Sequence, residues 1–275
     1  MNTLGTGHTR LGCDGTVAPP LRLHLIRHGK AMSSRVLSRV SDPSVADGQS
    51  ELDPAKISAD YDALHPVGCE QARRLGAHLA KAGHTFERVV CGPMQRHQST
   101  LEHMRLGAGL HACHWPEAVT IETTREVAFE VLVSRHLAST IHTLPGAAEA
   151  KAAEATRQGA QHETTTSLVA NLIMAWQRGE IDAEGVESPE AFRTRSRAAL
   201  SEITSLVGSG DVAVITSLGV INEMLAAAAP STGAAFRWLN NASVSRIRLQ
   251  EGRYEIECVG DTSHLAGEAG LATLI

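Results

Sequence analysis

The spacing of apolar and polar residues predicts short strands that recur along the chain. Residues 21–26 read Leu-Arg-Leu-His-Leu-Ile, an alternation with the two-residue period of a strand, and the run stops at Gly29. The continuous apolar run at 212–215 is typical of a strand that is buried on both faces. Two alternating runs on either side of Glu251-Gly252 indicate a hairpin. Strands are therefore predicted at 21–26, 89–91, 212–215, 244–249 and 254–259.

Apolar residues at helical spacing predict helices between these strands. The segment 66–81 carries such a stripe and stops before Gly83, a common helix-ending residue. Ser188-Pro189-Glu190 combines a capping hydroxyl, a proline in the first turn and an acid near the positive end of the helix dipole. Helices are predicted at 66–81, from about 94, within about 145–178, at 188–207 and at 220–228.

Strands that alternate with helices and end in a hairpin predict a three-layer α/β/α domain. Its central sheet is expected to be mostly parallel, with an antiparallel hairpin at one edge. We expect one domain over 20–270, preceded by a flexible tail over 1–19 that is rich in Gly and Thr. The segment at about 145–178 is expected to be a helical insertion in this domain.

Composition excludes several classes of function. The 275-residue chain has a net charge of -5 and no long run of Lys or Arg, so nucleic-acid binding is not expected. Its five cysteines lack Cys-x-x-Cys spacing and its 14 histidines form no His-Glu-x-x-His motif, so neither a metal site nor a disulfide framework is predicted. No apolar run approaches the roughly 20 residues that span a bilayer. We expect a cytoplasmic protein with reduced thiols and no membrane contact.

Candidate chemistry lies where the predicted strands end, because ligands of mostly parallel sheets bind outside the carboxyl ends of the strands. Arg27-His28-Gly29 follows the first strand. A neutral His28 offers a nucleophilic nitrogen, and Arg27 offers a planar fork for phosphate oxygens. Gly29 allows its backbone N–H groups to approach an anion. Arg96 lies in the first turn of the helix after the second strand, where its charge adds to the helix dipole, so these residues predict a phosphate pocket.

Transfer of a phosphoryl group to histidine also needs a proton donor for the leaving oxygen. A carboxylic acid with a raised pKa can supply that proton. Glu126 follows residues 121–125, which we expect to form a strand that leads into a loop, and Glu122 and Glu130 are close by. The spacing alone does not choose among these three glutamates.

Several segments resemble the histidine phosphatase superfamily, which includes the cofactor-dependent phosphoglycerate mutases. Residues 25–31, Leu-Ile-Arg-His-Gly-Lys-Ala, are similar to the Arg-His-Gly signature of that family. Residues 61–72 resemble its Leu-Thr/Ser-Pro-x-Gly-x-x-Gln-Ala segment, and residues 92–100 resemble its Ser-Pro-Leu-x-Arg-x-x-x-Thr segment. Two later segments, 241–245 and 261–265, are similar to its C-terminal strands. The resemblance therefore implies a phosphoglycerate mutase-like fold.

The resemblance runs over about residues 21–266, in the family's order, and implies a role for each candidate residue. His28 matches the histidine that becomes phosphorylated. Arg27 and Arg96 match the phosphate-binding arginines. Glu126 is the best match to the family's acid, although the residues that follow it differ from the usual pattern.

Leu218 departs from the family pattern. The resemblance implies Ser-His-Gly after the last parallel strand, and this chain has Ser217-Leu218-Gly219. The histidine of the family hydrogen-bonds a phosphate oxygen, whereas leucine has no donor. Loss of one such donor lowers the rate of the chemical step by roughly 10²–10³-fold. His97 is the neighbour that we expect to compensate if any residue does.

Three functions follow as expectations. The first is a phosphatase that hydrolyses a small phosphomonoester through a phosphohistidine on His28, with no metal or organic cofactor. The second is a catalytically impaired protein that binds a small phosphorylated molecule through Arg27 and Arg96. The third is an enzyme that uses the His28 and Glu126 pocket for non-phosphoryl chemistry. The predicted C-terminal hairpin also offers an edge through which a homodimer could form.

Overall fold

The computed structural model describes residues 19–32, 61–140, 170–230, 235–268 and 270–274. The predicted tail lies almost entirely outside the described residues, and so does most of the predicted insertion. At the end of that insertion, residues 170–177 are helical. Within the described ranges, no helix is both long and apolar enough to cross a membrane.

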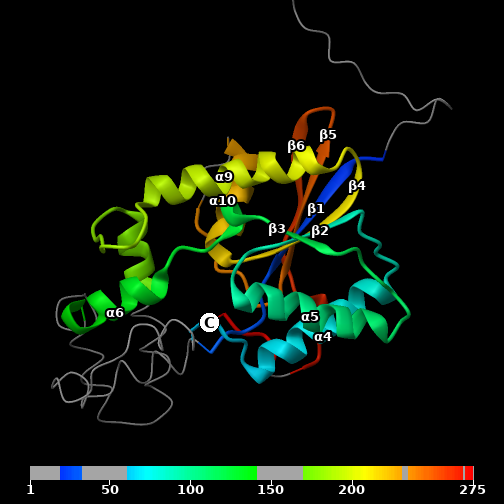
Figure 1. Cartoon of the computed structure of the whole chain (residues 1–275), viewed down its shortest axis with the longest axis horizontal. Coiled ribbons are helices and arrows are strands. Elements are labelled where there is room, and N and C mark those ends of the chain that lie inside the picture. The colour runs from blue at the N-terminus through cyan, green and yellow to red at the C-terminus, as the bar shows by residue number, and fades with distance from the viewer. Residues whose placement is uncertain (1–18, 33–60, 141–169, 231–234, 269, 275) are drawn as a thin grey trace, which may run out of the picture.

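A six-stranded sheet forms the centre of the fold, in the order β3-β2-β4-β1-β5-β6 (Figure 1). The first four strands in this order are parallel. The last two form an antiparallel hairpin that pairs with β1. The predicted sheet with an antiparallel edge is therefore confirmed. The strands are β1 (Leu21–Arg27), β2 (Arg88–Cys91), β3 (Ala118–Thr120), β4 (Gly210–Thr216), β5 (Val244–Gln250) and β6 (Arg253–Asp261).

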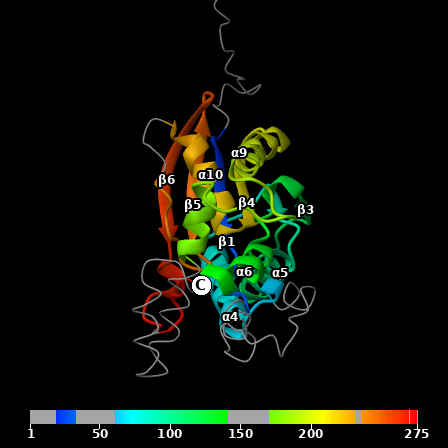
Figure 2. The ribbon, with the colours of Figure 1, turned by 90° about the vertical axis from the view of Figure 1, so that its left-hand side faces the viewer.

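Helices cover both faces of the sheet, which gives the three layers (Figures 1 and 2). The alternation of β1 divides its side chains between two cores. Leu23 and Leu25 face α9 (Pro189–Leu206) and α10 (Leu218–Ala228), whereas Ile26 faces α4 (Pro66–Lys81) and α5 (Gln95–Gly109). Arg22 and His24 alternate with these leucines and thus lie on the side of α4 and α5.

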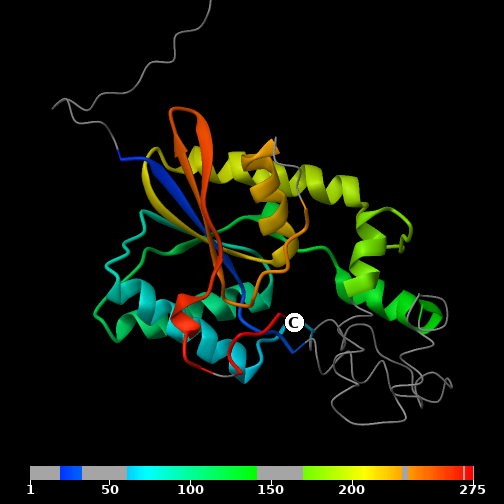
Figure 3. The same ribbon diagram turned by 180° about the vertical axis from the view of Figure 1, so that it is seen from behind.

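A helical lobe lies beside the sheet, next to the N-terminal end of α9 (Figure 3). It consists of α6 (Phe129–Thr140), which the sequence did not predict, and the helical residues 170–177. Trp176 contacts the rings of Phe129 and Phe192 edge-on, with centroid distances of 5.7 and 5.6 Å. These contacts continue the core of the main domain into the lobe.

Two element boundaries differ from the prediction and change the site. The strand expected over 121–125 is wrong, because the chain forms a 3-10 turn, η1 (Glu122–Thr124), in which the Thr124 hydroxyl and N–H both donate to the Ile121 carbonyl. Helix α10 begins at Leu218, two residues before the predicted start, so Leu218 belongs to the first helical turn. A second 3-10 turn, η3 (Ser263–Leu265), leads to the last residues of the chain, which lie close to the end of β1 (Figures 1 and 3).

Candidate active site

A small pocket lies at the carboxyl ends of β1 and β4, where the sequence predicts the chemistry. Its volume is about 70 Å³, several times the roughly 10–15 Å³ that a cavity needs to hold one water molecule. This volume suits a group of a few heavy atoms. The described residues that line it are Arg27, His28, Ala31, Tyr61, Arg96, Glu126, Phe129, Ile173, Leu218, Trp238 and Asn241.

His28 presents a neutral imidazole to this pocket. Its Nδ1 lies 2.7 Å from the carbonyl oxygen of Gly29. A carbonyl only accepts, so Nδ1 carries the proton and Nε2 keeps its lone pair. Burial lowers the pKa of His28 well below 6.5, and the charges of Arg96 and Arg27 lower it further. The side chain therefore has the tautomer and charge that a nitrogen nucleophile requires.

The glycine after His28 serves packing rather than anion binding. The Gly29 N–H donates to the Thr100 hydroxyl at 3.0 Å, so it does not point at a ligand. A Cβ at Gly29 would lie 2.4 Å from the carbonyl oxygen of Gly68, at the start of α4. The expectation that Gly29 supplies an anion-binding N–H is thus wrong, and the residue instead allows the two backbones to approach.

The guanidinium of Arg27 is held by two backbone carbonyls, and its Nε remains as a donor for a ligand. Its Nη1 donates to the carbonyl of Leu239 and, at 2.6 Å, to the carbonyl of Leu274. Its Nε is buried and has no hydrogen-bond partner among the described residues. Burial lowers the pKa of Arg27 to about 10, although the charge of Glu126 opposes this effect. The guanidinium therefore stays positive at neutral pH, with one buried donor that an anion could satisfy.

Arg96 is held on the other side of the pocket by Asp62. Its Nη1 lies 3.1 Å from Asp62 Oδ1, and its guanidinium lies 5.5 Å from the centre of the Tyr61 ring. The Asp62 carboxylate also accepts from the N–H groups of Gln95 and Arg96, at 2.8 and 3.3 Å. Asp62 thus caps the start of α5, and the expectation that this helix end faces the bound anion is wrong. The Nε of Arg96 is buried without a partner in the described part of the chain.

Glu126 is the one of the three candidate glutamates that lines the pocket. Its Oε2 accepts from the Gly219 N–H at 2.9 Å and its Oε1 from the Val127 N–H at 3.1 Å. Burial raises its pKa, while these two hydrogen bonds and the charge of Arg96 oppose the rise. Glu122 instead binds Arg125 at the surface, at 2.7 Å. The result is a buried carboxyl group with a raised pKa in the same pocket as His28.

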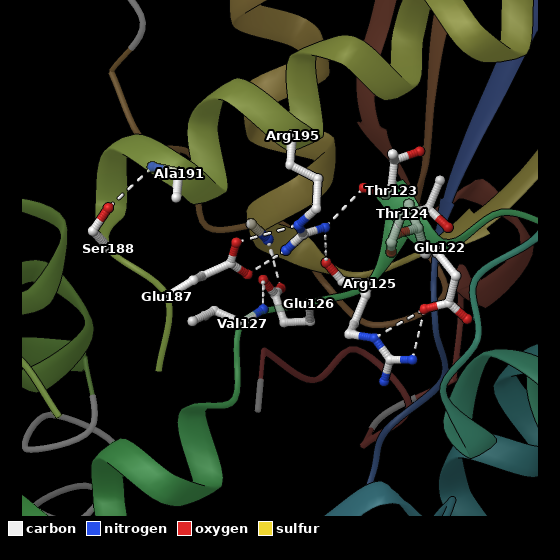
Figure 4. Close-up of polar contacts among 12 residues, drawn as sticks. Glu122, Thr123, Thr124, Arg125, Glu126, Val127, Glu187, Ser188, Ala191 and Arg195 are labelled. Carbon is white, nitrogen blue, oxygen red and sulfur yellow. Dashed lines mark hydrogen bonds and ion pairs between the residues drawn. The ribbon is translucent and has the colours of Figure 1, made fainter. Parts of the chain in front are cut away.

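Arg195 fixes the segment that carries Glu126 (Figure 4). From α9, its Nη1 donates to the carbonyls of Thr123 and Arg125, both at 2.8 Å. Its Nε and Nη2 bind the carboxylate of Glu187. The arginine therefore ties the turn before Glu126 to α9, which makes it a positioning residue that sequence reasoning missed.

Leu218 points into the pocket and gives it an apolar wall together with Phe129, Ile173 and Trp238. Its side chain is 8% exposed. His97 does not compensate for the missing donor, because its Nε2 is bonded to the Ser217 hydroxyl at 2.7 Å and its ring does not line the pocket. No other histidine than His28 lines the described pocket.

Several lining residues had no individual signal in the sequence. Tyr61 lies in a segment that the resemblance had already marked, without a role, and so does Asn241, whose Nδ2 is 3.4 Å from the His28 carbonyl. Phe129, Ile173 and Trp238 come from the helical lobe and from the loop before β5.

Comparisons with known proteins agree with this geometry. The sequence model of the histidine phosphatase superfamily (branch 1) matches residues 23–153 and 120–262. No curated protein sequence matches the chain. Since the family match covers most of the sequence, the chain belongs to the histidine phosphatase superfamily.

Solved structures of similar fold come from several organisms. A phosphoglycerate mutase from Bacillus anthracis has a TM-score of 0.53 at 19% identity, over 90% of this chain and 96% of its own. The alpha-ribazole phosphatase from Shigella flexneri has a TM-score of 0.54 at 19% identity, over 88% of this chain and 96% of its own. A phosphoserine phosphatase from Entamoeba histolytica reaches 0.51 at 14% identity, over 89% and 99%. At these identities the likeness shows the fold and not the substrate.

Proposed function

We propose that this protein is a phosphatase that hydrolyses a small phosphomonoester through a phosphohistidine on His28. In the first half-reaction, Nε2 of His28 attacks phosphorus and the ester P–O bond breaks. The carboxyl group of Glu126 gives its proton to the leaving oxygen, which departs as an alcohol. Arg27 and Arg96 hold the phosphoryl oxygens and offset their charge.

In the second half-reaction, water replaces the histidine. The carboxylate of Glu126 takes a proton from water as the oxygen of that water attacks phosphorus. The P–N bond breaks, its electron pair returns to Nε2, and inorganic phosphate forms. Throughout, the Nδ1 proton of His28 stays on its hydrogen bond to Gly29, which orients the ring and stabilises the positive charge of the phosphorylated imidazole.

One observation carries this proposal. The neutral His28 turns its unprotonated nitrogen toward a pocket that also contains a buried acid and two buried arginines with unused donors. The only cationic side chains that line the described pocket are Arg27 and Arg96. This favours a phosphatase over a mutase, because retention of a bisphosphorylated intermediate needs more positive charge.

A second candidate function rests on Leu218. A pocket with two arginines and no second histidine binds a phosphate group but lacks one donor for the charge that develops in the transition state. A protein of this kind binds phosphate esters and leaves His28 unmodified. The apolar wall also favours a third candidate, an enzyme that uses His28 and Glu126 for non-phosphoryl chemistry. With such an enzyme, vanadate does not compete with the substrate.

The test is release of phosphate from a generic aryl phosphate by the unaltered chain, by His28→Ala and by Leu218→His. A phosphatase releases phosphate, is inhibited by vanadate and loses the activity in His28→Ala. No release by the unaltered chain, with a gain in Leu218→His, replaces this proposal with phospholigand binding. No release by either, with no effect of vanadate on ligand binding, leaves non-phosphoryl chemistry.

A further inference from the structure

Three side chains that are distant in the sequence meet at the opposite end of the sheet from the candidate active site. His24 lies on β1, Asp211 is the second residue of β4, and His84 lies in the connection between α4 and β2. His24 and Asp211 point to the same face because β1 and β4 are parallel neighbours in register. One potential ligand atom from each residue lies within 4.8 Å of the other two.

The distances between these atoms are close to the ligand–ligand distances around a bound metal ion. Nε2 of His24 lies 3.0 Å and Nδ1 of His84 lies 3.6 Å from the same oxygen, Oδ2 of Asp211. Zinc bonds to nitrogen and oxygen of about 2.0–2.1 Å place tetrahedral ligands about 3.3–3.4 Å apart. The separation of His84 from Asp211 is too long for a hydrogen bond, but it needs to change little for joint coordination.

The cluster is open to solvent on the side of His84. The imidazole of His24 is fully buried, whereas that of His84 is 28% exposed, so an ion and a fourth ligand from water can reach it. The Arg22 guanidinium lies 3.7 Å from the other carboxylate oxygen, Oδ1, and binds Glu257 at 2.8 Å. Arg246 on β5 is paired with Asp261. Both cations therefore have carboxylate partners other than Oδ2.

We propose that His24, His84 and Asp211 bind one divalent transition-metal ion, with Zn²⁺ as the best match to two imidazoles and one carboxylate. Such an ion joins β1, β4 and the connection before β2, so it stabilises the fold. It lies at the amino-terminal ends of the parallel strands and takes no part in chemistry at His28. The inference is therefore independent of the proposed phosphatase activity.

The experiment is a titration of the chelator-treated full chain with Co²⁺, followed by its visible absorption and then by displacement with Zn²⁺. We expect one ion per chain and a band typical of tetrahedral coordination. His84→Gln, a change at the most exposed ligand, is expected to weaken binding at least about tenfold. His111→Gln is the matched control, because His111 is an exposed histidine outside the cluster, and it is expected to bind as the unaltered chain does.

A second measurement covers the case in which a variant folds poorly. Zn²⁺ at a hundred times its Kd raises the folding equilibrium constant about a hundredfold, so Tm rises in the unaltered chain and in His111→Gln. The rise is expected to disappear in His84→Gln and in Asp211→Asn, each first shown to be folded by circular dichroism. Equal Co²⁺ binding by the unaltered chain and His84→Gln, or no saturable binding at all, would overturn the proposal.

Discussion

Replacement of Gly219 by alanine is expected to disable Glu126 without removing it. A Cβ at this position would lie 2.5 Å from Glu126 Oε1 and 2.9 Å from Cζ of Phe192. Ordinary contact begins at 3.4 Å, so the carboxyl group has to move by about 0.9 Å. A misplacement of this size costs on the order of 10²-fold in rate.

The same shift weakens the 2.9 Å hydrogen bond from the Gly219 N–H to Oε2. This bond holds the pKa of Glu126 down against burial, so its loss raises that pKa. The carboxyl group then stays protonated to higher pH. The basic limb of the pH profile of kcat/KM is therefore expected to move upward while kcat falls.

The assay is steady-state hydrolysis of an aryl phosphate over a range of pH, with Tm as a check on folding. Overpacking of this kind costs about 1–3 kcal/mol of stability, which Tm detects. Gly208→Ala is the matched control, because a Cβ there meets no atom within 4 Å. Unchanged kcat and an unchanged basic limb in folded Gly219→Ala would refute the role of Glu126, and so would an equal loss in Gly208→Ala.

Three further predictions use the same assay or simple denaturation. Arg195→Met is expected to lower kcat roughly tenfold, since hydrogen bonds from a charged group are worth about 1.5–3 kcal/mol. The control Arg197→Met, on the same helix, is expected to leave kcat unchanged. Equal losses of kcat in the two variants would argue against a positioning role for Arg195. Activity is expected to fall as pH rises through the raised pKa of Glu126, which gives the pH profile a basic limb. Glu126→Gln should remove this limb and lower the rate by about 10²–10⁴-fold. A basic limb that survives in the variant would belong to another group. Burial keeps His28 and His97 neutral in the folded state, so at these two sites the unfolded chain binds more protons below pH 6.5. Their contribution to the free energy of unfolding should therefore be constant above 6.5 and fall below it. Urea denaturation on both sides of that pH measures this, and His97→Gln should reduce the slope; a flat profile is the contrary outcome.

The central fold could be predicted because local patterns decide it. The alternation of β1 predicts both its strand conformation and the division of its side chains between two cores. Topology then brings the ends of the parallel strands together, which is why Arg27, His28 and Arg96 could be placed in one pocket from the sequence. The helical lobe was harder, because its packing depends on Trp176 contacts with two distant phenylalanines.

The details of the site depend on contacts between residues whose separation along the chain follows no regular pattern. Glu122 and Glu126 differ in role only because the 3-10 turn between them directs one to the surface and the other inward. Asp62 caps α5 from 33 residues away. His24 and Asp211 are separated by 187 residues, so no motif of metal ligands could reveal their cluster.

The proposed attack by His28 is tested most directly by trapping the phosphohistidine. The unaltered chain and His28→Ala are mixed with a phosphorus-labelled aryl phosphate, quenched rapidly in alkali, which preserves phosphohistidine, and digested for mass spectrometry. We expect one phosphoryl group on the peptide that contains His28, on its Nε2, and none in His28→Ala. Phosphate release without any label on His28, or label that persists in His28→Ala, would contradict nucleophilic attack by this residue.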